Sequence, residues 1–172
     1  MSVDVGDPAP TFELTDTEGG VHRPAGGPAS VVVFTCNHCP YALAWHDRIL
    51  AVARDYPDVK VLAVSSNDAV RYPSDSYEAM RERVQADGGW PMPYLYDESQ
   101  DVARAYGAQT TPDCFLIDGE GRVVYRGAPD ADYEDPSQNA AWLRDAIDAV
   151  LNGETPATAE TTPVGCSIKW KQ

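Results

Sequence analysis

A short run of apolar residues marks the centre of the predicted fold. Residues 31–34 read Val-Val-Val-Phe, and a Gly-Gly-Pro segment precedes them. A short β-branched run bounded by turn-forming residues is typical of a buried central strand. After it, Trp45, Ile49 and Val52 recur at the spacing of one helical face. The pattern therefore predicts a strand and then a helix, with residues 36–40 at the turn between them.

Strands and helices alternate along the rest of the chain. Residues 7–24 predict a small hairpin, because alternating polar and apolar residues flank a Glu-Gly-Gly turn. The apolar runs further predict strands at 59–64, 94–96, 114–117 and 122–126, and helical periodicity predicts helices at about 75–87, 99–106 and 135–152. This alternation is expected of an α/β protein, in which a sheet carries helices on its faces.

Pro40 limits where the first long helix can begin. Proline has no N–H and is tolerated only in the first turn of a helix. With Cys36 as the N-cap, Pro40 would remove the first intrahelical hydrogen bond, whereas an N-cap at Asn37 makes Pro40 the third helical residue. In both cases Cys36 lies beside unpaired backbone N–H groups and the positive end of the helix dipole.

The chain of 172 residues is long enough for one domain that needs no disulfides for its stability. We expect this domain over residues 1–153, because the last helical period ends there. Residues 154–172 begin with a Thr/Pro/Ala-rich segment and end in an alternating stretch, which predicts an extended arm packed on or near the domain. Cys166, Ile168 and Trp170 would share one face of this arm.

The charge balance narrows the range of partners. The formal net charge is −14 and the sequence pI is about 4.4, which disfavours binding to nucleic acid and to anionic membranes. The acidity fits two interpretations: a surface adapted to a high-salt cytoplasm, or an ordinary acidic protein that uses arginine rather than lysine. No apolar run is long enough to span a bilayer, and the first residues lack the pattern of a secretory signal. We therefore expect a cytoplasmic protein.

Cys36 and Cys39 form a Cys-x-x-Cys pair at the predicted strand-to-helix turn. In a reducing cytoplasm such a pair is more often catalytic or metal-binding than structural. Only a thiolate attacks a disulfide or a peroxide, so a reactive cysteine needs a lowered pKa. The helix dipole and His38 both favour the anion at Cys36, and Cys39, one turn further inward, would be the resolving thiol. The pair therefore predicts a redox-active dithiol that is more oxidising than a pair separated by Gly-Pro.

The other two cysteines differ in their surroundings. Cys114 lies inside an apolar strand and is expected to be a small buried hydrophobe. Cys166 lies in the arm beside Gly165, where it could resolve a sulfenic acid at Cys36, exchange with the disulfide, or pair with another chain. Cys166 is therefore a candidate third redox thiol.

Several motifs together resemble one superfamily. They are, in chain order, Gly6-Asp7-Pro8-Ala9-Pro10-x-Phe12, Phe34-Thr35-Cys36-Asn37-His38-Cys39-Pro40-Tyr41, Ser65-Ser66-Asn67-Asp68, Tyr94-Leu95-Tyr96-Asp97-Glu98, Tyr106-Gly107-Ala108, Thr111-Pro112-Asp113 and Gly165-Cys166-Ser167-Ile168-Lys169-Trp170-Lys171. Over essentially the whole chain the sequence resembles the thioredoxin-like superfamily, and more narrowly its peroxiredoxin-like, redoxin-type branch. The resemblance implies a thioredoxin-like fold, with a central mixed β-sheet flanked by helices and an N-terminal β-hairpin. It also implies a cis Pro112 next to Cys36. Thr35, His38 and Thr111 would then support the dithiol.

The sequence also departs from both parent families. Peroxiredoxins have a threonine three residues before their reactive cysteine and an arginine beside it in space. Here Thr35 immediately precedes Cys36, and the sequence does not place a matching arginine. Thioredoxins have a tryptophan before the first cysteine and a buried acid beneath the second. Here Thr35 takes the place of the tryptophan, and the preceding strand is wholly apolar.

Three functions fit these residues. The leading hypothesis is a thiol–disulfide oxidoreductase, in which Cys36 attacks a substrate disulfide and Cys39 displaces the reduced product. The enzymatic alternative is a thiol-dependent peroxidase with antioxidant activity, in which Cys36 is the peroxidatic cysteine. The third is a metal-binding protein with Cys36, His38 and Cys39 as ligands and Cys166 as a further one.

The leading hypothesis needs no cofactor and no metal. Its partners would be a protein or small-molecule disulfide, or a peroxide, together with a thiol electron donor. A substrate chain could pair as an added strand with the open backbone edge expected at Thr111 and Pro112. Nucleic acid and membranes are not expected as partners, and the sequence leaves the oligomeric state open.

Overall fold

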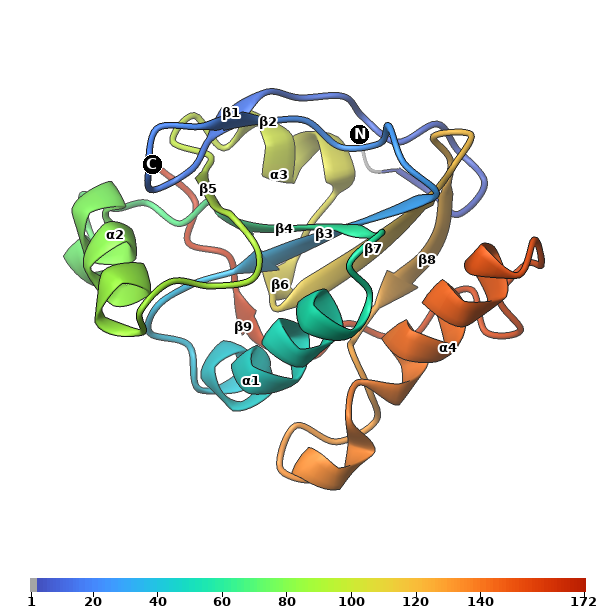
Figure 1. Cartoon of the computed structure of the whole chain (residues 1–172). Coiled ribbons are helices and arrows are strands. Elements are labelled where there is room, and N and C mark those ends of the chain that lie inside the picture. Colours follow the sequence, from blue (N-terminus) through green and yellow to red (C-terminus); the bar gives the residue numbers. More distant parts are fainter. Residues whose placement is uncertain (1–2) are drawn as a thin grey trace.

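A five-stranded mixed sheet forms the centre of the protein. The computed structural model describes residues 3–172 of the chain. The strand order is β5-β4-β3-β7-β8 (Figure 1). These strands are β3 (Ala29–Thr35), β4 (Lys60–Ser65), β5 (Tyr94–Tyr96), β7 (Asp113–Asp118) and β8 (Val123–Gly127). The pairs β3–β4 and β4–β5 are parallel, whereas β3–β7 and β7–β8 are antiparallel, so the predicted mixed sheet is confirmed.

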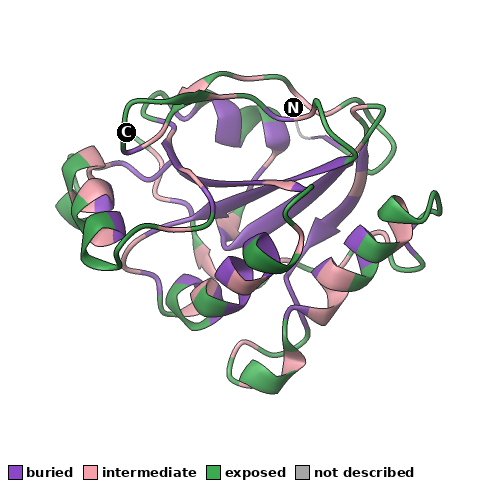
Figure 2. Ribbon diagram, viewed as in Figure 1, coloured by how far each residue is buried: buried purple, intermediate pink, exposed green. Residues whose placement is uncertain are grey.

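Helices cover both faces of this sheet. They are α1 (Pro40–Asp55), α2 (Tyr77–Ala86) and α4 (Ala141–Leu151) on one side, and α3 (Asp101–Tyr106) on the other. The central strand β3 is buried along its whole length (Figure 2), as its apolar run predicts. Val31 and Val33 point to the α1 side of the core, and Val32 and Phe34 point to the α3 side. The alternation of side chains along the strand therefore supplies both halves of the core.

The N-terminal hairpin is present but shorter than expected. Strand β1 (Leu14–Thr15) pairs with β2 (Val21–His22) in antiparallel register. Asp16 stabilises the turn, because its Oδ1 accepts hydrogen bonds from the amides of Glu18 at 2.8 Å and Gly20 at 2.9 Å. An aspartate that bonds amides further along the chain favours a turn over a longer ladder.

The last helix differs from the prediction at its start. Residues 135–152 form two pieces: the 3-10 helix η2 (Pro136–Gln138), and then α4. Asn139 and Ala140 separate them, because both have a φ of 54°, which no right-handed helix contains. Asp135 does act as a cap, through the amide of Ser137 at 3.0 Å, but it caps the 3-10 helix.

Helices α2 and α3 also begin later than expected. A 3-10 helix, η1 (Pro73–Asp75), precedes α2, whose N-cap Ser76 accepts a hydrogen bond from the amide of Ala79 at 3.1 Å. Helix α3 begins after Gln100, whose φ of 69° ends the loop, and Ser99 is not its cap. The short turn of η1 matters for function, because it directs the side chain of Asp75 into the interior.

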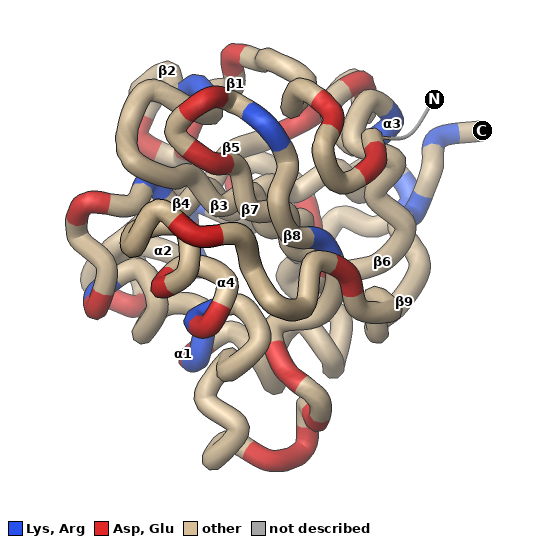
Figure 3. Tube along the Cα trace, turned by 90° about the vertical axis from the view of Figure 1, so that its right-hand side faces the viewer, with Lys and Arg blue, Asp and Glu red and all other residues tan. Residues whose placement is uncertain are grey.

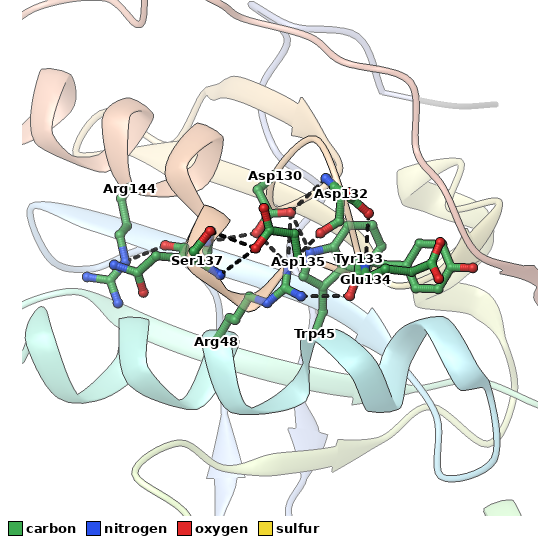
Figure 4. A network of polar contacts seen from close by, with 11 residues as sticks. Trp45, Arg48, Asp130, Asp132, Tyr133, Glu134, Asp135, Ser137 and Arg144 are labelled. Atoms are coloured by element: carbon green, nitrogen blue, oxygen red, sulfur yellow. Dashed lines mark hydrogen bonds and ion pairs between the residues drawn. The ribbon is translucent and has the colours of Figure 1, made fainter.

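A buried ion pair fixes the loop before α4 against α1. Asp130 Oδ2 lies 2.8 Å from Nη1 of Arg48, and both side chains are almost inaccessible to solvent (Figure 4). Asp130 also accepts hydrogen bonds from the indole N–H of Trp45 and from the amide of Ala140, both at 2.9 Å. A buried charge is tolerated when it is paired and hydrogen-bonded, and these contacts meet that condition. The network therefore anchors the helix that follows the dithiol.

The C-terminal arm first runs along the edge strand β8. Arg126 accepts a backbone hydrogen bond from Thr161 at 3.0 Å and donates one to Ala159 at 3.1 Å. Beyond this point, β9 (Cys166–Ser167) pairs antiparallel with β6 (Thr110–Thr111). The arm therefore reaches the neighbourhood of the Cys-x-x-Cys turn.

Charged residues are spread along the chain. Asp and Glu positions occur along most of the trace, with fewer Lys and Arg between them (Figure 3). Within residues 3–172, no helix has the length and apolar character needed to cross a membrane.

Candidate active site

Helix α1 begins at Pro40, and Cys39 is its N-cap. The expected N-cap at Asn37 is therefore wrong. At the first helical position an N–H group would have no partner within the helix, so the missing N–H of Pro40 costs no hydrogen bond there. The Asn37 side chain instead contacts two other elements: its Nδ2 donates to the carbonyl of Ser74, and its Oδ1 accepts from the hydroxyl of Tyr94, both at 2.8 Å.

Cys36 and Cys39 are free thiols and both are buried, with 1% and 0% of their surface exposed. The peptide bond between Thr111 and Pro112 is cis, and Thr111 contacts both thiols, which confirms the implied arrangement. Cys36 Sγ lies 3.4 Å from the hydroxyl of Thr111. Cys39 Sγ lies 3.2 Å from the Thr111 carbonyl, to which its thiol can donate. Thr111 therefore offers a hydroxyl to one sulfur and a carbonyl to the other.

The two thiols differ in acidity. A hydrogen bond with Cys39, together with burial, raises the pKa of Cys36 far above its usual range. The same hydrogen bond, with smaller contributions from Cys166, the first-turn amide of Ala42 and Thr111, lowers the pKa of Cys39 to about 4. The prediction of a lowered pKa at Cys36 is therefore wrong. Because the helix begins after Cys39, it is Cys39 that lies next to the unpaired amides.

Asp75 is a site residue that the sequence prediction missed. Its side chain is fully buried, and it accepts hydrogen bonds from the Asn37 amide at 2.7 Å and from Nδ2 of Asn67 at 2.9 Å. Its Oδ2 also lies 2.6 Å from Nδ1 of His38, whose ring stacks on that of Tyr72. His38 is thus held by a carboxylate from a distant loop. In the sequence, Asp75 is recognisable only as part of a predicted helix start. This pattern does not indicate that its side chain contacts the Cys-x-x-Cys loop.

An arginine lies beside Cys36, although the sequence does not show which one. Arg83 of α2 donates through Nη1 to the carbonyl oxygen of Cys36 at 3.3 Å and to Oδ1 of Asn37 at 3.0 Å. Its guanidinium also lies 5.1 Å from the ring centre of Trp90. Arg83 therefore holds the backbone of the Cys-x-x-Cys loop.

Other predicted residues lie further from the sulfur atoms. Thr35 is the last residue of β3, where it is buried and pairs with Ser65. Cys114 is fully buried, as expected, and burial raises its pKa well above the usual value. His46 packs on Trp90 with ring centres 4.5 Å apart, and burial lowers its pKa to about 4.

The backbone edge at Thr111 is occupied. Thr111 pairs with Cys166 in the β6–β9 ladder, so the open edge expected from the sequence is wrong. Figure 1 shows β9 beside β6 and the start of α1. Cys166 packs against the cluster formed by Cys36, Cys39 and Ala42. Strand β9 of the arm therefore occupies the edge at which a substrate strand is expected from the sequence.

Three potential metal ligands lie close together at the site. In the described part of the chain, Cys36, His38 and Asp75 bring one ligand atom each within 4.8 Å of one another. Cys39, which the metal-binding alternative includes, does not belong to this group. Both carboxylate oxygens of Asp75 already accept hydrogen bonds, so its burial is explained without a cation.

The fold and the site together define a thioredoxin-like protein, with a Cys-x-x-Cys pair at the start of a helix and a cis-proline loop across from it. A model of the AhpC/TSA family matches residues 5–126. The chain belongs to this family, which confirms the redoxin-type resemblance.

Individual relatives agree with this assignment. The chain is 29% identical over 127 residues to thiol-disulfide oxidoreductase ResA of Geobacillus thermodenitrificans, a match that covers 71% of this chain and 68% of the relative. The crystal structure of a hypothetical protein from Sinorhizobium meliloti has a TM-score of 0.92 and 38% identity, over 99% of this chain and 97% of that one. That of an uncharacterized conserved protein from Geobacillus kaustophilus has a TM-score of 0.89 and 39% identity, over 98% and 93%. These similarities place the chain in the class of thiol–disulfide oxidoreductases and redoxins.

A more distant likeness shows the fold alone. The exposed lipoprotein thioredoxin of Streptococcus pneumoniae has a TM-score of 0.61 and 22% identity, over 77% of this chain and 98% of that one. The predicted thioredoxin-like fold is therefore confirmed.

Proposed function

We propose that this protein is a thiol–disulfide oxidoreductase in which Cys36 and Cys39 alternate between a dithiol and a disulfide. The observation that supports this most strongly is the position of both thiols at the start of α1, where they pack together and each contacts Thr111. A thiolate is the nucleophile of thiol–disulfide exchange, and the second thiol resolves the mixed disulfide.

The contacts of Thr111 suit a reaction that starts at Cys36. The two thiols share one proton in the reduced protein. In the minor form that reacts, this proton is on Cys39, whose thiol donates to the Thr111 carbonyl, and the Cys36 thiolate accepts from the Thr111 hydroxyl. The Cys36 thiolate attacks one sulfur of the substrate disulfide, and the other sulfur leaves as a thiolate. This gives a mixed disulfide between Cys36 and the substrate.

Cys39 completes the reaction as the resolving thiol. When Cys36 is in the mixed disulfide, the first substrate thiolate takes the proton of Cys39, whose remaining contacts with Cys166, the Ala42 amide and Thr111 favour its thiolate. Cys39 attacks the sulfur of Cys36, so that the Cys36–Cys39 disulfide forms and the second substrate thiolate leaves. A thiol donor then returns two electrons to the pair. The substrates are disulfides, and the donor is a thiol.

A trapping experiment tests these roles. In a Cys39→Ser/Cys166→Ser variant no neighbouring thiol can resolve the intermediate, so oxidised glutathione should leave a stable adduct on Cys36, detected by peptide mass spectrometry. Cys36→Ser should lose the reduction of this disulfide. Cys114→Ser, which removes a buried cysteine outside the site, should keep it. Full activity of Cys36→Ser would refute the assignment.

A peroxidase is the second candidate, because Arg83 lies beside Cys36. In this reaction the Cys36 thiolate attacks the peroxide, forms a sulfenic acid and releases an alcohol or water; Cys39 then displaces water to give the disulfide. Arg83 donates to the backbone carbonyl of Cys36, so its contact holds the loop in place. This role serves thiol–disulfide exchange and favours the first candidate. Stopped-flow consumption of hydrogen peroxide by the reduced protein discriminates: a rate near that of free cysteine eliminates the peroxidase, and a far higher rate supports it.

A further inference from the structure

The C-terminal arm brings a third thiol to the dithiol. Cys166 lies opposite Thr111 in the β6–β9 pair and packs against Cys36 and Cys39. Its thiol contributes to the lowered pKa of Cys39. Cys36, Cys39 and Cys114 are buried, whereas Cys166 is partly exposed. Cys166 therefore connects the buried pair with the surface.

The backbone on both sides of Cys166 favours this close approach. A Cβ atom on Gly165 would lie 2.2 Å from the carbonyl oxygen of Thr111, so a residue with a side chain would force the arm away. On the other side, Ile168 is 3% exposed, and its amide donates to the carbonyl of Gln109 at 3.1 Å. The thiol is thus held in place by specific contacts before and after it.

Building on the proposed function, we propose that Cys166 is a third catalytic thiol. It takes over the disulfide from the buried pair, carries it to the surface, and there accepts electrons from a dithiol reductant. The arm acts as a built-in substrate strand, because it occupies the backbone edge beside the cis-proline and presents a cysteine to the dithiol.

The first step is an intramolecular exchange. The Cys166 thiolate attacks the sulfur of Cys39 in the Cys36–Cys39 disulfide; the Cys39–Cys166 bond forms, the Cys36–Cys39 bond breaks, and Cys36 leaves as a thiolate. No electrons are gained or lost. One thiolate of the reductant then attacks the sulfur of Cys166, and Cys39 leaves as a thiolate. The second thiol of the reductant displaces Cys166, so the reductant becomes a disulfide and all three protein thiols are restored.

The charges at the site favour this order of events. In the reduced protein, burial and the contact with the Cys39 thiolate raise the pKa of Cys166 to about 11. When Cys39 is in a disulfide, its negative charge no longer raises the pKa of Cys166. Burial still raises this pKa, and the positive charge of Lys169 lowers it. Cys166 therefore ionises more readily in the oxidised state, in which it has to attack.

Disulfide mapping tests the contact between the two sulfurs. In Cys36→Ser, one equivalent of the thiol oxidant diamide should produce an intramolecular Cys39–Cys166 disulfide, detected in acid-quenched, alkylated peptides by mass spectrometry. Free thiols, or disulfides between two protein molecules alone, would overturn the proposal.

Reduction kinetics test the route of the electrons. Cys166→Ser should still form the Cys36–Cys39 disulfide, but dithiothreitol should reduce it on the order of tenfold more slowly than wild type, because a tethered thiol acts at a high effective concentration. The matched control, Cys166→Ser/Ser167→Cys, moves the thiol to the opposite face of the strand and should remain slow. Equal rates for wild type and Cys166→Ser would overturn the proposal. If wild type formed no Cys36–Cys39 disulfide at all, the proposed function would fail instead.

Discussion

The carboxylate of Asp75 is buried beside the Cys-x-x-Cys loop, where it accepts a hydrogen bond from the Asn37 amide at 2.7 Å. The hydrogen bond with Cys39 and burial are the larger causes of the raised pKa of Cys36, and the charge of Asp75 adds to them. Asp75→Asn removes this charge, so the pKa of Cys36 should fall, because its thiolate is no longer repelled.

A pH titration of thiolate ultraviolet absorbance measures this effect. The alkaline step of the dithiol should move to lower pH in Asp75→Asn than in wild type. Glu120→Gln, which alters an exposed acid in the turn between β7 and β8, should leave the titration unchanged. An unchanged or higher alkaline step in Asp75→Asn would show that Asp75 does not act on Cys36 through its charge.

Individual residues differ in how far the sequence predicts them. Cys36 and Cys39 are recognisable from their spacing between a strand and a helix, which is a local pattern. Asp75 and Arg83 have no such pattern, since they reach Cys36 and its loop from α2 and the turn before it. Their position depends on how α2 packs, and no short stretch of sequence contains that information.

At the scale of elements, the pairing of β6 with β9 decides how accessible the dithiol is. Gly165→Ala places a methyl group 2.2 Å from the Thr111 carbonyl, which should loosen this pairing. Overpacking costs about 1–3 kcal/mol, so local opening of the arm should increase on the order of tenfold. We therefore expect faster alkylation of Cys36 by iodoacetamide and faster hydrogen exchange at the amides of β6.

A neighbouring substitution provides the control for this prediction. Val164→Ala shortens an exposed side chain of the same arm and should change neither rate. Unchanged alkylation in Gly165→Ala would mean that β9 does not limit access to Cys36.

The helix starts show why element boundaries are harder to predict than elements. The sequence predicts Pro40 in the first turn of α1, where the structure has it, but it allows more than one N-cap. The structure selects Cys39, because the Asn37 side chain is used by Ser74 and Tyr94. The later helix start places Cys39 beside the first-turn amides, of which that of Ala42 adds to the lowering of its pKa by Cys36.

At the scale of the whole molecule, the net charge of −14 implies mutual repulsion in the folded state. Sodium chloride shortens the Debye length from about 10 Å at 0.1 M to about 3 Å at 1 M, which screens this repulsion. We therefore expect the Tm to rise with sodium chloride concentration, measured by thermal unfolding followed by circular dichroism. An uncharged osmolyte at equal osmolality serves as the control, and a Tm that falls with salt would contradict the prediction.

The order of strands and helices, the buried central strand and the position of the dithiol can all be predicted from the sequence, because each depends on the periodicity or spacing of neighbouring residues. Its resemblance to a known superfamily added the cis-proline beside the site. Three features follow from tertiary packing: the arm closes the Thr111 edge, Cys166 packs against the cluster of Cys36, Cys39 and Ala42, and Asp75 and Arg83 contact the loop. These contacts join residues far apart in the chain, so they depend on packing rather than on local sequence.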